Sequence, residues 1–234
     1  MNFFRNAVVF MVTCASMSEL RADELNPELQ KYAIARVAEI SEIPADRREY
    51  LQKLADYISA RQSAGQTARL TFVCTHNSRR SQFAQLWATA AATYYGLDRL
   101  ESFSGGTEST AFNPRAIAAL TQAGFKIAAA PESESNPHYE VHFLKVGQPV
   151  ECFSKVYDSP PNPREDFCAV MTCSEADQAC PTVRGCDLRL AIPYTDPKIA
   201  DSTPRESATY AERCAQIARE MFFVMSQVDS KSSK

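Results

Sequence analysis

The sequence predicts an α/β fold, in which a parallel central sheet is flanked by helices on both faces and preceded by an N-terminal helical extension. Two segments, beginning at Leu70 and at Glu101, show a strand-like run followed by a helical pattern. Such alternation of strand and helix is typical of a parallel sheet. A third observation is the unbroken apolar run Phe167 to Thr172, because strands that are covered on both faces are apolar throughout.

The composition is that of an ordinary globular protein of 234 residues, with 45% hydrophobic and 23% charged residues. The formal net charge is -3 and there is no basic block, which argues against a nucleic-acid partner. Eight cysteines are many, but a chain of this size does not need disulfides to be stable. Because they include no C-x2-C zinc motif, we expect no metal site and favour redox chemistry.

Residues 1–22 are either a signal peptide or a mis-assigned start. Arg5 precedes an apolar run from Ala7 to Ala15, which has the length of a signal-peptide core and is too short to span a membrane. In the other reading the protein begins at Met17. We expect this second reading and a cytoplasmic protein, because free cysteines suit a reducing compartment. The alternative is an exported protein. No membrane span is expected elsewhere.

Residues 23–66 form the expected helical extension, and residues 67–230 the main domain. In the extension, the spacing of apolar residues predicts helices from Pro27 to Ile40 and from Ala45 to Arg61. We expect their apolar faces to pack against the rest of the protein. These faces are Leu29, Ile34, Val37 and Ile40 in the first helix and Leu51, Leu54, Tyr57 and Ile58 in the second.

The main domain begins with a strand from Leu70 to Cys74, followed by a helix over Gln82 to Tyr95 that Gly96 ends. Glu101 to Glu108 is the second strand. A cap residue and a first-turn proline, Asn113 and Pro114, start the next helix, and Gly124 ends it. The later elements are a hairpin of Tyr139 to Val146 and Val150 to Tyr157, strands at Phe167 to Thr172 and Leu188 to Tyr194, and an amphipathic helix from Pro204 to Val228.

The segment C-T-H-N-S-R-R-S, from Cys74 to Ser81, is the main candidate for a functional site. A loop that joins a strand to a helix N-terminus directs backbone N–H groups and the positive end of the helix dipole to one point, where an oxyanion binds. Arg80 adds a planar guanidinium that matches a tetrahedral oxyanion, and Cys74 is the expected thiolate nucleophile. The expected oxyanion-binding residues are Thr75, His76, Asn77, Ser78, Arg79 and Arg80.

Three more candidate residues lie at or after strand ends. Cys173 follows the apolar run at Phe167, Cys180 comes later in the same segment, and Asp196 follows the last short strand. If the strands that precede Cys74 and Cys173 are parallel, both cysteines lie at the same edge of the sheet. That edge is where α/β folds place their chemistry.

These motifs resemble the low-molecular-weight protein tyrosine phosphatase superfamily, which includes the thioredoxin-coupled arsenate reductases. Family members carry a C-x-G-N-x-C-R-S loop, an S-A-G-x-E-like turn and an Asp-Pro acid. This chain has C-T-H-N-S-R-R-S from Cys74, S-G-G-T-E from Ser104, and Asp196-Pro197. The reductases also carry a stretch like V-T-x-C-x-x-A-D-x-x-C-P, which reads V-M-T-C-S-E-A-D-Q-A-C-P from Val170 to Pro181. The resemblance covers about Leu70 to Val228.

The resemblance implies that the protein reduces arsenate to arsenite, a step in arsenic detoxification, through a cysteine cascade. Cys74 would attack the oxyanion, Ser81 would hydrogen-bond the thiolate, and Asp196 would protonate the leaving oxygen. Cys173 would then attack Cys74, and Cys180 would attack Cys173. No bound cofactor is expected, and an external dithiol, a thioredoxin-like protein, would supply the electrons.

Two alternatives remain open. The first is a low-molecular-weight protein tyrosine phosphatase, which would hydrolyse phosphomonoesters through a thiophosphate on Cys74. The second is a non-catalytic module that binds oxyanions or senses redox state. The loop departs from the family pattern at two positions. His76 replaces the glycine, where we expect the backbone to need a positive φ, and Arg79 replaces the second loop cysteine and adds a positive charge near the site.

Overall fold

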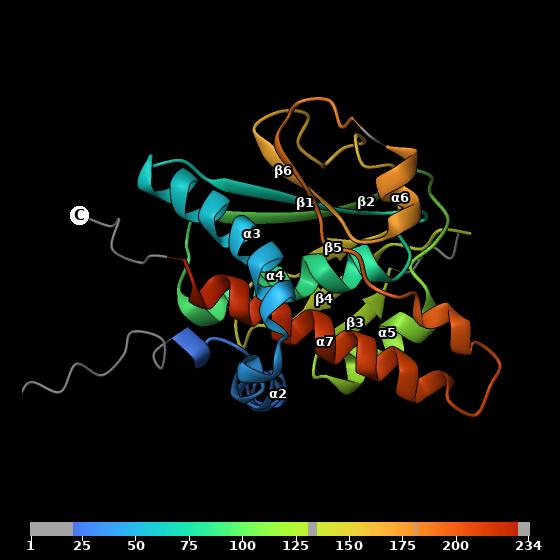
Figure 1. Cartoon of the computed structure of the whole chain (residues 1–234). Coiled ribbons are helices and arrows are strands. Elements are labelled where there is room, and N and C mark those ends of the chain that lie inside the picture. Colours follow the sequence, from blue (N-terminus) through green and yellow to red (C-terminus); the bar gives the residue numbers. More distant parts are fainter. Residues whose placement is uncertain (1–20, 131–134, 181, 229–234) are drawn as a thin grey trace, which may run out of the picture.

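The computed structural model describes residues 21–130, 135–180 and 182–228 (Figure 1). The two readings of residues 1–22 therefore lie almost wholly outside the described residues. Within the described ranges no helix combines the length and the apolar character needed to cross a membrane.

The central sheet is parallel and has four strands in the order β2-β1-β6-β7. These are β1 (Ala68–Cys74), β2 (Leu100–Gly106), β6 (Phe167–Met171) and β7 (Cys186–Ala191). The register aligns Val73 of β1 with Met171 of β6, so the chain leaves both strands at the same edge. The predicted α/β fold is confirmed, and so is the expected placement of Cys74 and Cys173 at one edge.

Helices cover both faces of this sheet, as expected. One face packs on α3 (Ala45–Ser63) and α4 (Arg80–Tyr95), α7 (Glu206–Ser226) packs on these two helices, and α5 (Pro114–Gln122) packs on α7. The other face carries the short helix α6 (Ser174–Ala179), which contacts β1 and β6. The sheet is apolar on both sides because successive residues of β1 enter different buried clusters, Phe72 on the α4 side and Val73 on the α6 side.

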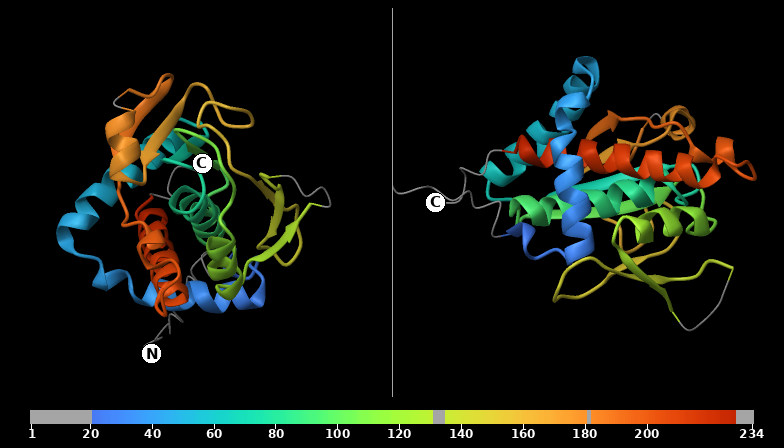
Figure 2. Two further views of the ribbon diagram at one scale, coloured as in Figure 1. Left: turned by 90° about the vertical axis from the view of Figure 1, so that its right-hand side faces the viewer. Right: turned by 90° about the horizontal axis from the view of Figure 1, so that it is seen from below.

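The N-terminal extension consists of α2 (Pro27–Ala38) and α3, joined by a single turn of 3-10 helix, η1 (Ile40–Glu42). Figure 2 shows α2 crossing α7, while α3 packs on α7, β1 and β7. The expected apolar face of α3 is buried. In α2 the expectation for Ile34 was wrong: it is 54% exposed. Leu29 and Ala33, one turn apart, form the buried contact instead.

A second, antiparallel sheet has the order β3-β4-β5. The predicted hairpin is present as β4 (Tyr139–His142) and β5 (Val150–Cys152), both shorter than expected, and β3 (Lys126–Ala129) joins them as an unpredicted strand. Only Ile127 in β3 is partly buried, so its sequence gave little periodic signal.

The residues that were predicted to begin or end α4 and α5 do so in the structure. Gly96 ends α4 in the left-handed conformation with φ 70°. The Asn113 side chain caps α5 by accepting a hydrogen bond from the N–H of Arg115, and Pro114 occupies the first turn. A second short 3-10 helix, η2 (Pro197–Ala200), follows β7. Helix α7 begins two residues later than expected, at Glu206, and its predicted apolar face is buried.

Candidate active site

The loop between β1 and α4, residues 75–79, has its backbone carbonyl groups turned outward. The Thr75 carbonyl accepts from the N–H of Glu108, and the Ser78 carbonyl accepts from the N–H of Asn113. The carbonyls of His76 and Asn77 accept from side chains, at 2.8 Å from Ser154 Oγ and 3.1 Å from Gln82 Nε2. Every one of these acceptors is therefore satisfied from outside the loop.

The same loop leaves its N–H groups free. Among the described residues, no backbone N–H of residues 75–79 donates a hydrogen bond to another protein group. The buried Nε of Arg80 also has no hydrogen-bond partner there. Free donors in a loop that leads into a helix N-terminus form an anion site. This loop therefore has the donors that a tetrahedral oxyanion needs.

Gly106, the second glycine of the S-G-G-T-E turn, allows this loop to lie close to β2. A Cβ atom at that position would lie 2.7 Å from the carbonyl oxygen of Thr75 and 2.8 Å from the nitrogen of Asn77. Both atoms are backbone atoms of the loop and could not move aside without changing its shape. The glycine at position 106 is therefore needed for the close approach of the loop to β2. The motif did not predict this role.

The left-handed residue of the loop is Asn77, with φ 47°, and the expectation of a positive φ at His76 was wrong. Asparagine adopts this conformation more readily than most residues. The imidazole of His76 is half-exposed and lies away from the loop interior, with 2.9 Å between its Nε2 and Glu108 Oε1. Replacing the family glycine at position 76 therefore does not strain the backbone.

The nucleophile and its hydrogen-bond partner are close together and buried. Cys74 Sγ lies 3.1 Å from Ser81 Oγ, and Asn77 Nδ2 donates to the same Ser81 Oγ at 2.9 Å. Because Ser81 Oγ accepts this bond from Asn77, its own proton is available to the Cys74 sulfur. The arrangement therefore directs a hydrogen-bond donor at the Cys74 sulfur. The Asn77 side chain also accepts from the N–H of Lys155 at 3.0 Å.

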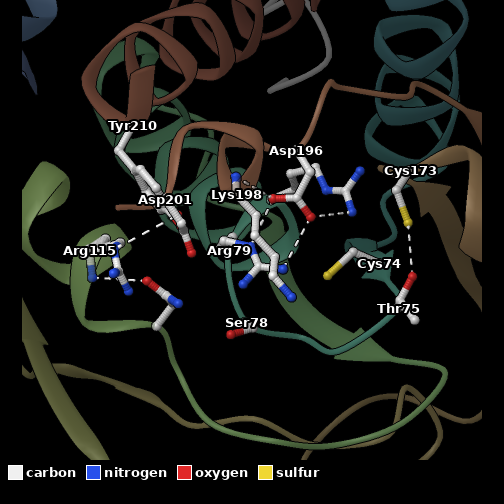
Figure 3. Close-up of polar contacts among 12 residues, drawn as sticks. Cys74, Thr75, Ser78, Arg79, Arg115, Cys173, Asp196, Lys198, Asp201 and Tyr210 are labelled. Atoms are coloured by element: carbon white, nitrogen blue, oxygen red, sulfur yellow. Dashed lines mark hydrogen bonds and ion pairs between the residues drawn. The ribbon is translucent and has the colours of Figure 1, made fainter. Parts of the chain in front are cut away.

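Asp196 is bound by both loop arginines. Its carboxylate is 2.8 Å from Arg79 Nε, 3.1 Å from Arg79 Nη2 and 2.9 Å from Arg80 Nη2 (Figure 3). It also accepts from the N–H of Lys198 at 3.0 Å, while Arg80 Nη1 donates to the carbonyl of Tyr194 at 3.0 Å. Burial alone would raise the pKa of Asp196, but the bonds from Arg79 and the charge of Arg80 lower it below its ordinary value. Asp196 is thus a carboxylate in this state.

Cys173 and Cys180 cap the two ends of α6. Cys173 is the N-cap residue, and its sulfur accepts from the N–H of Ala176 at 3.3 Å. The same sulfur lies 3.5 Å from Thr75 Oγ1, directed at the neighbour of Cys74 (Figure 3). Cys74 and Cys173 belong to one buried cluster, and partly buried Cys180 packs against it. Burial raises the pKa of Cys173, against the effect of the Thr75 and Ala176 hydrogen bonds.

Arg189 of β7 holds the C-terminal end of α6. Its guanidinium donates to the carbonyl of Asp177 at 2.7 Å and to the carbonyl of Cys180 at 3.1 Å. It also forms an ion pair of 2.6 Å with the Asp177 carboxylate. Three contacts from one side chain therefore fix the helix turn that leads to Cys180. Arg189 was not among the predicted site residues, because it belongs to no local motif.

Of the other described cysteines, Cys186 packs against the cluster of Cys74 and Cys173, as Cys180 does, while Cys152, Cys168 and Cys214 belong to a different buried cluster. Cys214 is buried on α7, accepts a hydrogen bond from Trp87 Nε1 at 3.3 Å, and has its pKa raised by burial to about 12. Burial likewise raises the pKa of Cys168 well above its usual range. Cys186 donates its thiol proton to the carbonyl of Val183. Thiols of this kind are poor nucleophiles.

Comparison with known proteins agrees with the motifs over part of the chain. Residues 69–141 match the family model described as low molecular weight phosphotyrosine protein phosphatase. No match is found among curated proteins.

Several solved structures are similar in shape at low identity. A low molecular weight phosphotyrosine phosphatase from Vibrio cholerae has 14% identity and a TM-score of 0.46, covering 71% of this chain and 99% of that one. One from T. tengcongensis has 13% identity and a TM-score of 0.44, covering 68% and 99%. A thioredoxin-dependent arsenate reductase from Corynebacterium glutamicum has 15% identity and a TM-score of 0.35, covering 80% and 81%. At these values the likenesses specify no substrate.

The matched stretch contains Cys74, the loop that follows it, Arg80 and the S-G-G-T-E turn. The other two parts of the resemblance, Asp196-Pro197 and the stretch from Val170 to Pro181, lie outside it. Over residues 69–141 the chain therefore matches the low molecular weight phosphotyrosine protein phosphatase family.

Proposed function

We propose that this protein reduces arsenate to arsenite through a cascade of three cysteines. One observation carries the proposal: cysteines cap both ends of α6, and the first of them contacts the residue next to Cys74. Hydrolysis of a phosphoester requires only Cys74, Arg80 and an acid. A pair of thiols beside the nucleophile is what a reduction requires in addition.

In the first step arsenate would bind to the free N–H groups of residues 75–79 and to Arg80 Nε. The Cys74 sulfur would then bond to arsenic while one arsenic–oxygen bond breaks. The oxygen takes up protons and leaves as water. Ser81 stabilises the attacking thiolate through the 3.1 Å contact, and the loop N–H groups stabilise the charge on the remaining oxygens.

In the second step Cys173 would attack the Cys74 sulfur. A disulfide forms, the sulfur–arsenic bond breaks and its electron pair remains on arsenic, so As(V) becomes As(III) and arsenite leaves. The two thiols supply the two electrons. Because the pKa of Cys173 is raised by burial, this thiol must pass its proton to another group before it attacks, and the departing oxyanion is a base within the site.

In the third step Cys180 would attack Cys173 and return Cys74 to its thiolate form. The six residues of α6 separate the two cysteines, and a helix rises about 1.5 Å per residue, whereas the Cα atoms of a disulfide are usually within about 7 Å. The helix must therefore unwind for this disulfide to form. An external dithiol, such as a thioredoxin-like protein, would then reduce it.

Asp196 is proposed to protonate the leaving oxygen after the oxyanion has displaced it from Arg80. In the resting site the lowered pKa keeps this residue ionised. Binding of a substrate anion to Arg80 removes part of the interaction that lowers this pKa. The same displacement releases Asp196 Oδ2 from Arg80, while Arg79 would still hold the carboxyl group at the mouth of the site.

Phosphomonoester hydrolysis is the second candidate function. The match of residues 69–141 to a phosphotyrosine protein phosphatase model favours it, and the same loop would hold a phosphate. In this reaction water hydrolyses the Cys74 thiophosphate, and Cys173 and Cys180 take no part.

One comparison separates the two functions. The wild type, Cys173→Ser, Cys180→Ser and Cys214→Ser would be assayed for arsenate-dependent consumption of reductant with thioredoxin and its reductase, and in parallel for hydrolysis of an aryl phosphate. We expect loss of arsenate reduction in the first two variants and not in Cys214→Ser, which is the matched buried control. Hydrolysis that persists in Cys173→Ser shows that the loop is still folded. Absence of arsenate reduction in the wild type would contradict the proposal.

A further inference from the structure

A second polar cavity, of about 290 Å³, lies between the N-terminal extension and the main domain. Its walls come from the start of α3, from the inner face of α7, and from the chain segment 193–195 between β7 and Asp196. This volume is at the lower end of the range typical of small-molecule sites. None of the residues of the Cys74 loop lines it.

Three arginines line the cavity, and one of them has no carboxylate partner. Arg47 pairs with Glu220 at 2.8 Å, and Arg219 lies 3.5 Å and 3.6 Å from the carboxylates of Glu39 and Glu42. Arg213 forms no ion pair with any described residue; its only polar partner there is the side-chain amide oxygen of Gln216. Asp46 and Glu220 are the acids in the lining itself. The lining itself therefore holds three cationic side chains and two acids, and Arg213 is the cation without an ion pair to a described residue.

Three donors in this lining lack acceptors. Within the described part of the chain, the buried Nε atoms of Arg213 and Arg219 have no hydrogen-bond partner. The hydroxyl of Tyr194 also has none of normal geometry, although Arg47 stacks on its ring and Glu220 is nearby. Tyr194 is 4% exposed. Buried donors are almost always satisfied in folded proteins, so three unsatisfied donors in the lining of one cavity point to a missing acceptor.

The start of α3 supplies further donors. Its N-cap residue, Pro44, has no side chain that can cap the helix, and Pro44, Asp46 and Arg47 all line the cavity. The first N–H groups of a helix lack partners within the helix, and its dipole favours an anion there. The helix start and the unpartnered Tyr194 hydroxyl are independent features that meet in one cavity.

We propose that this cavity binds a small phosphate-bearing molecule, with Arg213 as its principal charged contact. A phosphate group has several acceptor oxygens and so can bind an arginine, a tyrosine hydroxyl and a helix N-terminus together. It also offsets the burial of Arg213, which lowers the pKa of that guanidinium; Tyr194 and Glu220 act against this lowering, and the nearby charges of Arg80 and Arg47 add to it. The N-terminal extension, which lies outside the family resemblance, would then complete a site that the main domain lacks alone.

The cavity is separate from the catalytic loop but shares a wall with it. Tyr194 lines the cavity through its side chain, while its carbonyl accepts a hydrogen bond from Arg80 at 3.0 Å. Asp196 follows two residues later. A ligand that orders segment 193–195 would therefore act on the support of Arg80 and Asp196. The inference holds whether the loop catalyses reduction or hydrolysis.

Titration calorimetry with inorganic phosphate tests the proposal. The wild type would be compared with Arg213→Gln, with Arg80→Gln, and with Arg205→Gln as the control. Arg205 lies just before the same helix, but it is exposed and pairs with Glu212. We expect two phosphate sites in the wild type and in Arg205→Gln, and one in each of the other two variants. The affinity of the cavity site should fall at least about tenfold in Arg213→Gln, as expected for a lost charge-assisted hydrogen bond.

The outcomes distinguish this proposal from the function of the loop. If the loop alone binds phosphate, the wild type and Arg213→Gln will both show one site, and the proposal is overturned. If the cavity alone binds it, the wild type will show one site and Arg213→Gln none, which supports the cavity and contradicts the loop.

Two milder variants guard against a folding defect in Arg213→Gln. Tyr194→Phe removes only a hydroxyl that has no partner, so we expect weaker phosphate binding at the cavity with an unchanged or higher melting temperature. Arg213→Lys keeps the charge and should retain part of the affinity. Full cavity binding in Tyr194→Phe and Arg213→Gln, both folded, would overturn the assignment of these residues.

Discussion

Arg79 and Asp196 form a two-pronged ion pair at the mouth of the Cys74 loop, with 2.8 Å between Arg79 Nε and Asp196 Oδ1 and 3.1 Å between Nη2 and Oδ2. Arg80 contacts the same carboxylate. The loop therefore contacts an internal anion, which the proposed oxyanion substrate would have to displace from Arg80. Arg79 stands where the resembled family has a cysteine, so this pair is a particular feature of the chain.

Arg79→Gln should raise the pKa of Asp196 toward its ordinary value and move the alkaline limb of the activity profile, where a general acid loses its proton, to higher pH. Because the pKa of Asp196 is lowered in the folded protein from 3.8, the stability that the pair contributes is present above that pH and is lost as the pH falls through the lowered value. The variant should be about 1–3 kcal/mol less stable at neutral pH.

Denaturant unfolding at neutral pH and at a pH below the ordinary carboxyl value checks this prediction. The difference between wild type and Arg79→Gln should shrink at the acidic pH. Arg205→Gln removes an exposed pair with Glu212 and should change stability little at either pH. A loss of stability in Arg79→Gln that is independent of pH would show that the ion pair is not its cause.

Asn77→Ala should destabilise the protein by about 2–4 kcal/mol and slow alkylation of Cys74. The change removes buried hydrogen bonds to Ser81 and Lys155 and places alanine at φ 47°, where a Cβ costs about 1 kcal/mol. Asn77→Gly removes the same bonds without that conformational cost. It should therefore recover about 1 kcal/mol of stability but not the rate of alkylation by iodoacetamide. Equal stability of the two variants would refute the role of the left-handed conformation.

Arg189→Gln should make the Cys173–Cys180 disulfide harder to reduce. Arg189 stabilises the helical, dithiol form of α6 through its contacts with Asp177 and Cys180. Loss of about 1.4 kcal/mol of this stabilisation lowers the midpoint potential by about 30 mV. Equilibration in glutathione buffers, followed by labelling of free thiols and mass analysis, measures the potential. Arg69→Gln, which removes an exposed pair with Glu101 in the sheet, is the control. An unchanged potential in Arg189→Gln would mean that α6 unwinds without breaking these contacts.

Cys214→Ala should lower stability without affecting catalysis. The substitution leaves a small cavity and an unpaired N–H on Trp87, at a cost of about 1–3 kcal/mol. Burial raises the pKa of this thiol to about 12, so it should resist alkylation in the native wild type and react only on unfolding. Thermal unfolding and thiol counting check both statements. Alkylation of native Cys214 at the rate of Cys180 would contradict them.

The sequence predicted those elements of the fold that are specified by a short run of neighbouring residues. Continuous apolar strands, Gly96 as the end of α4 and Asn113 as the cap of α5 are local features, and each lies where it was expected. Strand β3 and helix α6 were not expected. Strand β3 is largely exposed and helix α6 spans only six residues. Neither element therefore has enough periodic apolar residues to be recognised from the sequence.

The sequence by itself determined the nucleophile, its loop and the candidate cysteine pair, because each is a run of neighbouring residues. Only the tertiary structure decided which distant groups meet them. Asp196 is held by Arg79 and Arg80, Arg189 holds the turn before Cys180, and Asn77, not His76, takes the left-handed conformation. These relationships depend on the parallel register that brings the ends of β1, β6 and β7 to one edge of the sheet. Asp196 lies more than a hundred positions from both arginines, and contacts over such separations leave no local pattern in a single sequence.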